Sequence, residues 1–122
     1  MKAQRISAQI VKQRMKKGDY FIFIDARRPE AWASSDIKLP HARRIPAGEI
    51  EQRLHEIPSG LPIITYCTCP EEASSASAAE KINQHGFKEV YALTGGLDAW
   101  RAAGNRVEKK EAGAENSGHG IF

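Results

Sequence analysis

Three apolar segments alternate along the chain with segments of helical periodicity. They span residues 20–26, 61–66 and 87–93. The stretches "YFIFIDA" and "LPIITY" lack the alternation of polar and apolar residues that is typical of a strand with one solvent-exposed face. Strands of this kind lie in parallel sheets whose two faces are both covered. Because helices separate the segments, the sequence predicts an α/β fold with a central parallel sheet.

Four helical segments are expected around these strands. Ser7 is the expected N-cap of the first helix, and Gly18 ends it. The other three span residues 48–57, 74–85 and 95–104. The side chains expected to face the core are Ala8, Val11, Met15, Ile50, Leu54, Ile57, Ala76, Ala79 and Ile82.

The connection over residues 27–48 is expected to be mostly irregular. It contains three prolines, which donate no backbone hydrogen bond and therefore interrupt helices and strands. Within it we expect one helical turn near residues 30–33 and a short strand near residues 43–45.

Length and composition exclude several classes of protein. The 122 residues suit a single domain, expected over residues 1–107, with residues 108–122 as a disordered tail. The net charge of +3 comes without a basic stripe interleaved with aromatic residues, so we expect no nucleic-acid partner. The apolar runs are far shorter than the roughly 20 residues of a membrane span, and no signal peptide is visible. Two cysteines cannot build a disulfide framework, so a cytoplasmic location is the simpler prediction.

Both cysteines, Cys67 and Cys69, follow the second apolar segment and precede a helix rich in small residues. In parallel sheets the carboxyl ends of the strands form the working edge. Backbone amides of the loop and the positive end of the helix favour a thiolate there, lowering the pKa of a thiol from its usual value of about 8.5. A strand-end thiolate is a nucleophile. The alternative is that the cysteines are buried filler, since free cysteine packs as a small hydrophobe.

Four segments of the chain resemble, in order and spacing, those of the rhodanese-like (sulfurtransferase) domain family. They are "FIFIDARRPEAW", "IPAGEIEQRL", "IITYC" and "HGFKEVYALTGGLDAWRAAG", within residues 6–107. The resemblance implies a three-layer fold, in which helices cover both faces of a parallel sheet of about five strands. It also implies a cysteine that takes a sulfane sulfur from a donor as a persulfide and passes it to an acceptor such as cyanide or a thiol. That chemistry needs neither a metal nor an organic cofactor.

The resemblance also implies roles for individual residues. Asp25 and Arg27 match the family's Asp-x-Arg, which holds loops around the site. Trp32 and Trp100 are expected to pack rather than to contact substrate. The expected active-site loop consists of Cys67, Thr68, Cys69, Pro70, Glu71, Glu72, Ala73, Ser74 and Ser75.

Two alignments with the family leave two candidates for the nucleophile. Cys67 keeps the strand ending "IITYC", whereas Cys69 keeps the family's loop length before the serines. We favour Cys67, because the end of a strand positions a side chain better than the interior of a loop. The other thiol either resolves the persulfide or is a bystander.

The predicted loop carries Glu71 and Glu72 where the family often has a basic residue. Two carboxylates near the sulfur would repel a dianion, so we expect a neutral persulfide or a persulfide-bearing protein, rather than thiosulfate, as the donor. The alternative is that both glutamates face solvent or cap the helix. The stretch "SDIKLPHA" also departs from the family pattern, so no role is assigned to it.

Two other functions share this fold. A phosphatase needs an arginine six positions after its cysteine, where this chain has Ala73 or Ser75, so that reading is disfavoured. A non-catalytic or redox-sensing binding module that uses the Cys-x-Cys pair as a switch is the main alternative. The histidines show no ligand spacing to the cysteines, so no metal site is expected.

Overall fold

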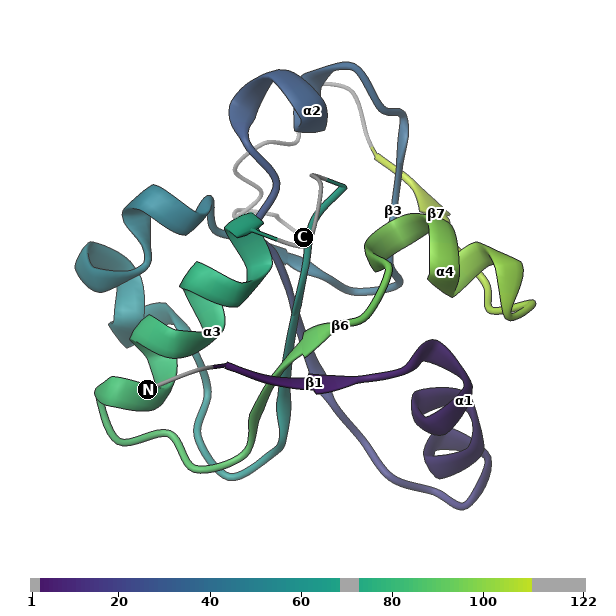
Figure 1. Cartoon of the computed structure of the whole chain (residues 1–122), viewed down its shortest axis with the longest axis horizontal. Coiled ribbons are helices and arrows are strands. Elements are labelled where there is room, and N and C mark those ends of the chain that lie inside the picture. The colour runs from purple at the N-terminus through teal and green to yellow at the C-terminus, as the bar shows by residue number, and fades with distance from the viewer. Residues whose placement is uncertain (1–2, 69–72, 111–122) are drawn as a thin grey trace.

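The structure is a computed structural model that describes residues 3–68 and 73–110. Its centre is a five-stranded parallel sheet with the strand order β1-β6-β5-β2-β4. The edge strand β1 and its neighbour β6 lie side by side in Figure 1. The strands are β1 (Gln4–Ile6), β2 (Ile22–Asp25), β4 (Arg43–Arg44), β5 (Ile63–Tyr66) and β6 (Val90–Leu93). All four residues of β5 are buried, as expected for the middle strand of a covered parallel sheet. The predicted α/β fold is confirmed.

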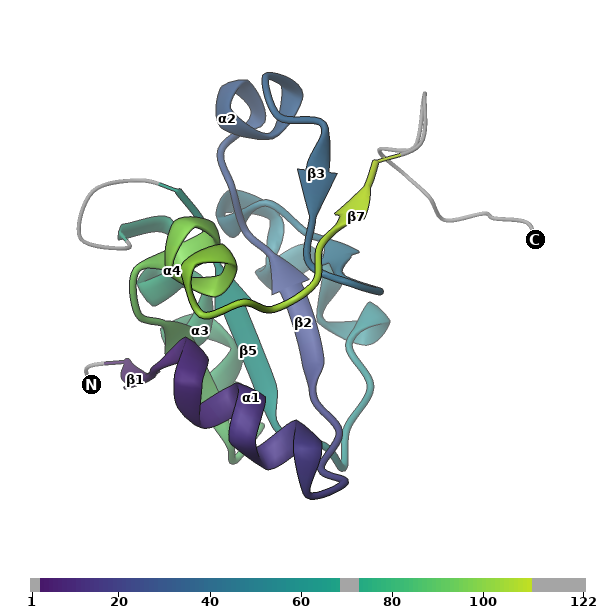
Figure 2. The same ribbon diagram turned by 90° about the vertical axis from the view of Figure 1, so that its right-hand side faces the viewer.

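Helices cover both faces of the sheet (Figure 2). On one face, α1 (Ala8–Lys16) and α4 (Gly96–Ala102) share an apolar cluster that contains Val11, Leu97 and Trp100. On the other face, α3 (Ala73–Gln84) packs with the short 3-10 helices η1 (Ala47–Glu49) and η2 (Glu51–Glu56) around Ile50, Ala79 and Ile82. These two clusters form the core.

A small group of elements lies above the carboxyl end of the sheet. It comprises α2 (Pro29–Ala33) and an antiparallel pair, β3 (Ile37–Lys38) with β7 (Glu108–Lys109) (Figure 2). The described part of the chain therefore continues past the domain boundary expected at residue 107. Residues 111–122, the rest of the predicted disordered tail, lie outside the described residues.

The first helix confirms one sequence prediction and contradicts another. The Ser7 Oγ accepts a hydrogen bond from the Ile10 amide at 3.2 Å, so Ser7 is the N-cap. Ala8 and Val11 are buried as predicted, but Met15 is 38% exposed. Met15 lies in the last turn of α1, where no residue is buried.

The segment predicted as a helix over residues 48–57 forms η1 and η2 instead, with non-helical dihedral angles at Arg53. The Arg53 guanidinium donates to the Arg44 carbonyl and to two glutamates, which anchors the kink. A helix this short depends on tertiary contacts, so local periodicity did not decide its form.

The inward face of α3 is turned relative to the prediction. Ala79 and Ile82 are buried as expected, but Ala76 is only half-buried, and Ser75 and Ala78 are buried in its place. The buried positions keep helical spacing. The sequence reading missed this face because its first member, Ser75, is polar.

The two tryptophans have different surroundings. Trp100 is buried and packs edge-on against Phe23. Trp32 is half-buried outside the core, with Arg44 and Lys110 over its ring. The Lys110 Nζ also donates to the Trp32 carbonyl, which attaches the end of the described chain to α2.

Candidate active site

Cys67 directly follows the central strand β5, at the carboxyl edge of the sheet. It is 1% exposed, and its Sγ lies 3.5 Å from the Ser75 Oγ on α3. The Cys67 carbonyl accepts a hydrogen bond from the Leu97 amide of α4 at 3.3 Å. The residue is therefore attached to helices on both faces of the sheet.

The first turn of α3 is fixed to the same strand. The Thr65 Oγ1 donates a 2.7 Å hydrogen bond to the Ser75 carbonyl, and both side chains are fully buried. This bond satisfies a buried hydroxyl and holds Ser75 in register with the strand end. The Ser75 hydroxyl consequently lies beside the Cys67 sulfur.

Gly96, the first residue of α4, lies close to the backbone of Cys67. Its φ is +59°, and a Cβ placed there would lie 2.0 Å from the Cys67 carbonyl oxygen. No side chain fits so close to a backbone oxygen, and only glycine adopts this conformation readily. The approach of α4 to the strand end therefore requires glycine at this position.

On the other side of the strand end, Asp25 and Arg27 form a buried, two-pronged ion pair. The Arg27 Nε and Nη2 donate to the two Asp25 carboxylate oxygens at 2.9 and 2.7 Å. Burial lowers the pKa of Arg27, but its hydrogen bonds with Asp25 and the charge of that carboxylate outweigh burial, so the pKa lies above its ordinary value. The Arg27 Nη1 is buried and, within the described residues, has no hydrogen-bond partner.

Tyr66 joins this pair to the surrounding loops. Its hydroxyl donates to the Asp25 Oδ2 at 3.0 Å and accepts from the Leu39 amide at 3.2 Å. Burial and the charge of Asp25 raise the pKa of Tyr66 well above its ordinary value. Arg27 also donates to the Ile37 carbonyl. These contacts are consistent with the support role predicted for Asp25 and Arg27, and the sequence reading missed Tyr66 as a partner.

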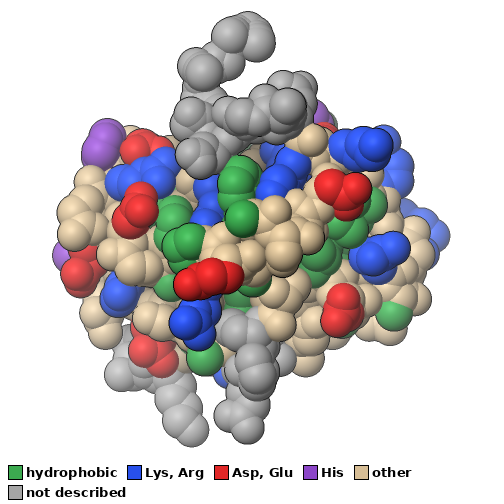
Figure 3. Space-filling model, turned by 90° about the horizontal axis from the view of Figure 1, so that it is seen from above, with side chains coloured by type: hydrophobic (Ala, Val, Ile, Leu, Met, Phe, Trp, Pro, Cys, Tyr) green, Lys and Arg blue, Asp and Glu red, His purple; other side chains and the backbone are tan. Residues whose placement is uncertain are grey.

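A cavity of about 350 Å³ lies beside the strand-end thiol. Its described lining consists of Arg28, Glu30, Ala31, Cys67 and Thr68. Figure 3 views the molecule from this end, where basic, acidic and apolar side chains share one face. A larger cavity, of about 620 Å³, is lined mainly by residues 19–23, 40, 41, 43 and 104–106, and no cysteine lies in its described lining. We therefore place the candidate active site at the smaller cavity.

Arg28 is a functional candidate that the sequence reading missed. The sequence analysis considered only the loop after the cysteine, where this chain has Glu71 and Glu72 in place of the family's basic residue. In the structure, a basic residue of the cavity lining comes from the segment after β2. The only sequence signal was the second of two consecutive arginines behind Asp25.

The predicted loop residues are only partly described. Thr68 lies in the cavity wall and is exposed, Ala73 begins α3 and is exposed, and Ser74 is half-buried. Cys69, Pro70, Glu71 and Glu72 lie outside the described residues, so the expected ring of amides and the role of the second thiol stay predictions. Within residues 3–68 and 73–110, no cluster of three or more potential metal ligands occurs, and no helix has the length and apolar character to span a membrane.

The chain has matches among known protein families, curated proteins and solved structures. Residues 7–103 match the family described as Rhodanese-like domain. The chain belongs to this family. The rhodanese-like domain described here is 32% identical over 88 residues to the uncharacterized protein YqhL of Bacillus subtilis, a match that covers 72% of this chain and 64% of that protein, less than two-thirds of its length.

Two further relatives extend the comparison. This rhodanese-like domain is 30% identical over 99 residues to the thiosulfate sulfurtransferase GlpE of Pseudomonas aeruginosa, covering 81% of this chain and 84% of that protein. It also resembles the crystal structure of the BH2092 protein of Bacillus halodurans, with a TM-score of 0.71 and 30% identity over 98% of this chain and 84% of that chain. These matches assign the chain to a family that includes sulfurtransferases.

Proposed function

We propose that this chain is a sulfurtransferase that carries a sulfane sulfur on Cys67 as a persulfide. The observation that supports the proposal is the position of Cys67, at the carboxyl end of the central strand and in the wall of a cavity of about 350 Å³. A cavity of this size admits a small sulfur compound. The Ser75 hydroxyl, 3.5 Å from the sulfur, is a group that can donate a hydrogen bond to a Cys67 thiolate.

The reaction divides into two displacements. The Cys67 thiolate attacks the outer sulfur of the donor, the new S–S bond forms, and the donor's own bond to that sulfur breaks, so that its electron pair leaves with sulfite or a thiolate. Cyanide or a thiolate then attacks the outer sulfur of the persulfide and releases the Cys67 thiolate. No electron acceptor is required, since the sulfane sulfur moves without net oxidation of the protein.

The burial of Cys67 fits this role. An added sulfur lies about 2 Å beyond the Cys67 Sγ, far enough to enter the neighbouring cavity. Because the parent side chain is 1% exposed, bulk water and oxidants have little access to it. The outer sulfur of the persulfide is then accessible to ligands in the cavity, while the Cys67 Sγ stays buried.

Arg28 changes the expectation for the donor. The sequence reading disfavoured thiosulfate because it found two glutamates and no basic residue in the loop, but Arg28 lines the cavity. Thiosulfate, an organic persulfide and a persulfide-bearing protein are therefore all candidate donors, and cyanide or a thiol the acceptor. The cytoplasmic location stays a prediction.

A turnover assay tests the function. The protein is supplied with thiosulfate or an organic persulfide together with cyanide, and thiocyanate is measured. We expect Cys67→Ser to lower the rate at least about 100-fold, because the serine hydroxyl cannot replace the thiolate as nucleophile. Cys69→Ser is the matched control and should keep most of the activity. Full activity of Cys67→Ser would refute the assignment, and an inactive parent would favour the binding module.

A further inference from the structure

The cavity beside Cys67 carries one positive and one negative side chain from the same short segment. Arg28 is the N-cap of α2, and Glu30 lies in its first turn. Arg27, the residue before Arg28, is fully buried with Asp25. Because the backbone at Arg28 is extended, the Arg28 side chain points the opposite way, toward solvent. Both Arg28 and Glu30 are exposed and line the cavity.

These two charges are not used elsewhere in the described part of the chain. Among residues 3–68 and 73–110, no hydrogen bond or ion pair engages the side chain of either Arg28 or Glu30, and they do not pair with each other. Other opposite charges close in sequence do pair, as Arg53 does with Glu49. The cavity therefore offers a cation and an anion with their hydrogen-bonding groups available to a ligand.

A ligand that satisfies both charges must itself carry both signs. A guanidinium binds a carboxylate through two parallel hydrogen bonds, and a carboxylate binds an ammonium group. Thiosulfate, a dianion, gains from Arg28 but is repelled by Glu30. An amino acid carries a carboxylate and an ammonium group on one carbon, and its size suits the small cavity.

We propose that Arg28 and Glu30 form a two-charge recognition site that selects a zwitterionic persulfide, an amino acid whose side chain ends in S–SH, as the sulfur donor. The inference rests on the proposed function of Cys67. The Cys67 thiolate attacks the terminal sulfur, the Cys67–S bond forms, the S–S bond of the donor breaks, and the amino-acid thiolate leaves with the electron pair and takes a proton from solvent. Arg28 and Glu30 hold the donor's charged end while this occurs.

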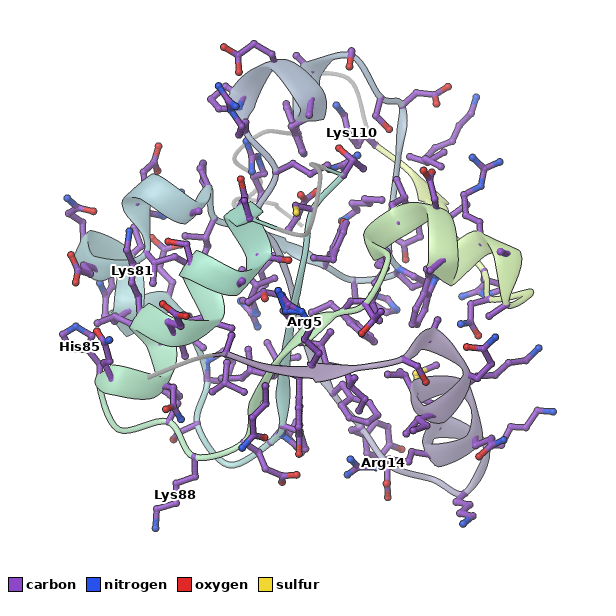
Figure 4. The ribbon with its side chains drawn as sticks, viewed as in Figure 1. Arg5, Arg14, Lys81, His85, Lys88 and Lys110 are labelled. Atoms are coloured by element: carbon purple, nitrogen blue, oxygen red, sulfur yellow. The ribbon has the colours of Figure 1, made fainter. Side chains whose placement is uncertain are left out.

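The test compares three donors: cysteine persulfide as the zwitterion, thiosulfate as the dianion, and hydroxyethyl persulfide as an uncharged donor. For each protein, the rate of sulfur gain on Cys67 is measured by intact mass, and the first two rates are divided by the rate with the uncharged donor. The variants are Arg28→Gln and Glu30→Gln. Lys88→Gln, at the opposite end of the molecule from α2 and Lys110 (Figure 4), is the matched loss of one exposed charge.

We expect Glu30→Gln to lower the normalised rate with cysteine persulfide by roughly tenfold and to raise that with thiosulfate about threefold. Arg28→Gln should lower both by roughly tenfold. Lys88→Gln should change neither. If Glu30→Gln leaves the preference for cysteine persulfide over thiosulfate unchanged while all donors still load Cys67, the selectivity proposal is wrong and the sulfurtransferase proposal stands. If no donor loads the parent protein, both are wrong.

Discussion

Tyr66 and Cys67 are neighbours in sequence, yet their side chains enter two very different environments. The Tyr66 hydroxyl joins a buried network in which the Asp25 carboxylate accepts four hydrogen bonds from described residues: from the Arg27 amide, Nε and Nη2 and from the Tyr66 hydroxyl. Cys67 instead lies beside the Ser75 hydroxyl and in the wall of a cavity. Adjacent residues of an extended strand point to opposite faces, so one strand end serves both environments. The network fixes the backbone, and the cavity leaves the sulfur room to react.

The largest effect should come from breaking the buried ion pair. Asp25→Asn leaves the Arg27 guanidinium buried without a countercharge, and we expect the free energy of unfolding to fall by about 3–5 kcal/mol. Chemical denaturation measures this loss. Asp19→Asn is the matched control, because Asp19 pairs with Arg14 at the surface, and such pairs contribute about 0–1 kcal/mol. Equal losses in the two variants would contradict the distinction between the network and ordinary surface charge.

The next largest effect concerns the backbone behind the cysteine. Gly96→Ala introduces a Cβ against the Cys67 carbonyl at a positive φ, and we expect a loss of at least about 2 kcal/mol together with slower alkylation of Cys67. The matched control is Gly48→Ala, because nothing lies within 4 Å of a Cβ at Gly48. A Gly96→Ala protein with unchanged stability and thiol reactivity would show that the close approach does not position Cys67.

Tyr66→Phe removes one hydroxyl from the network. We expect a loss of about 1–3 kcal/mol, because the Leu39 amide is left without its partner. Burial and Asp25 raise the pKa of Tyr66 in the folded protein above its ordinary value of 10.0. Below pH 10, Tyr66 is therefore protonated in both the folded and the unfolded state. Above it, the unfolded chain loses the proton first, so stability falls as pH rises.

Unfolding curves recorded from pH 8 to pH 11 separate this contribution. The parent protein should lose stability more steeply above about pH 10 than Tyr66→Phe does. Parallel declines in the two proteins would mean that Tyr66 ionises as easily in the folded state as in the unfolded one.

The smallest effect is expected on the cavity side. Ser75→Ala removes the hydroxyl beside the sulfur, and we expect sulfur transfer to slow by roughly tenfold, with little loss of stability because the Thr65 bond goes to the backbone of Ser75. The same change at Ser77, on the same helix, serves as control. If Ser75→Ala loses stability but keeps its rate, the hydroxyl is part of the packing rather than of the chemistry.

The two environments also differ in how far the sequence predicted them. The continuous apolar character of residues 61–66 indicated a buried central strand, and the position of Cys67 at its end followed directly. The partnership of Asp25 with Tyr66 depends on the register between β2 and β5, which places these residues opposite each other. Register is a tertiary property, and local periodicity does not contain it.

The cavity was harder to predict, because its charged lining comes from another part of the chain. Arg28 and Glu30 lie in the connection over residues 27–48, which was expected to be mostly irregular but contains α2, β3 and β4. The sequence predicted a helical turn near residues 30–33, where α2 forms, but the position of α2 over the strand end is a tertiary property that local pattern does not contain. Sequence reasoning therefore found the nucleophile candidate and missed the charged residues that line the same cavity.

The most direct test of the account is to locate the transferred sulfur. After incubation with a sulfur donor in the absence of acceptor, intact mass spectrometry should show a gain of one sulfur, about 32 Da, on the parent protein and on Cys69→Ser. Cys67→Ser should show no gain. A sulfur that appears on Cys67→Ser and disappears from Cys69→Ser would place the chemistry on the other thiol and contradict the assignment of the strand-end cysteine.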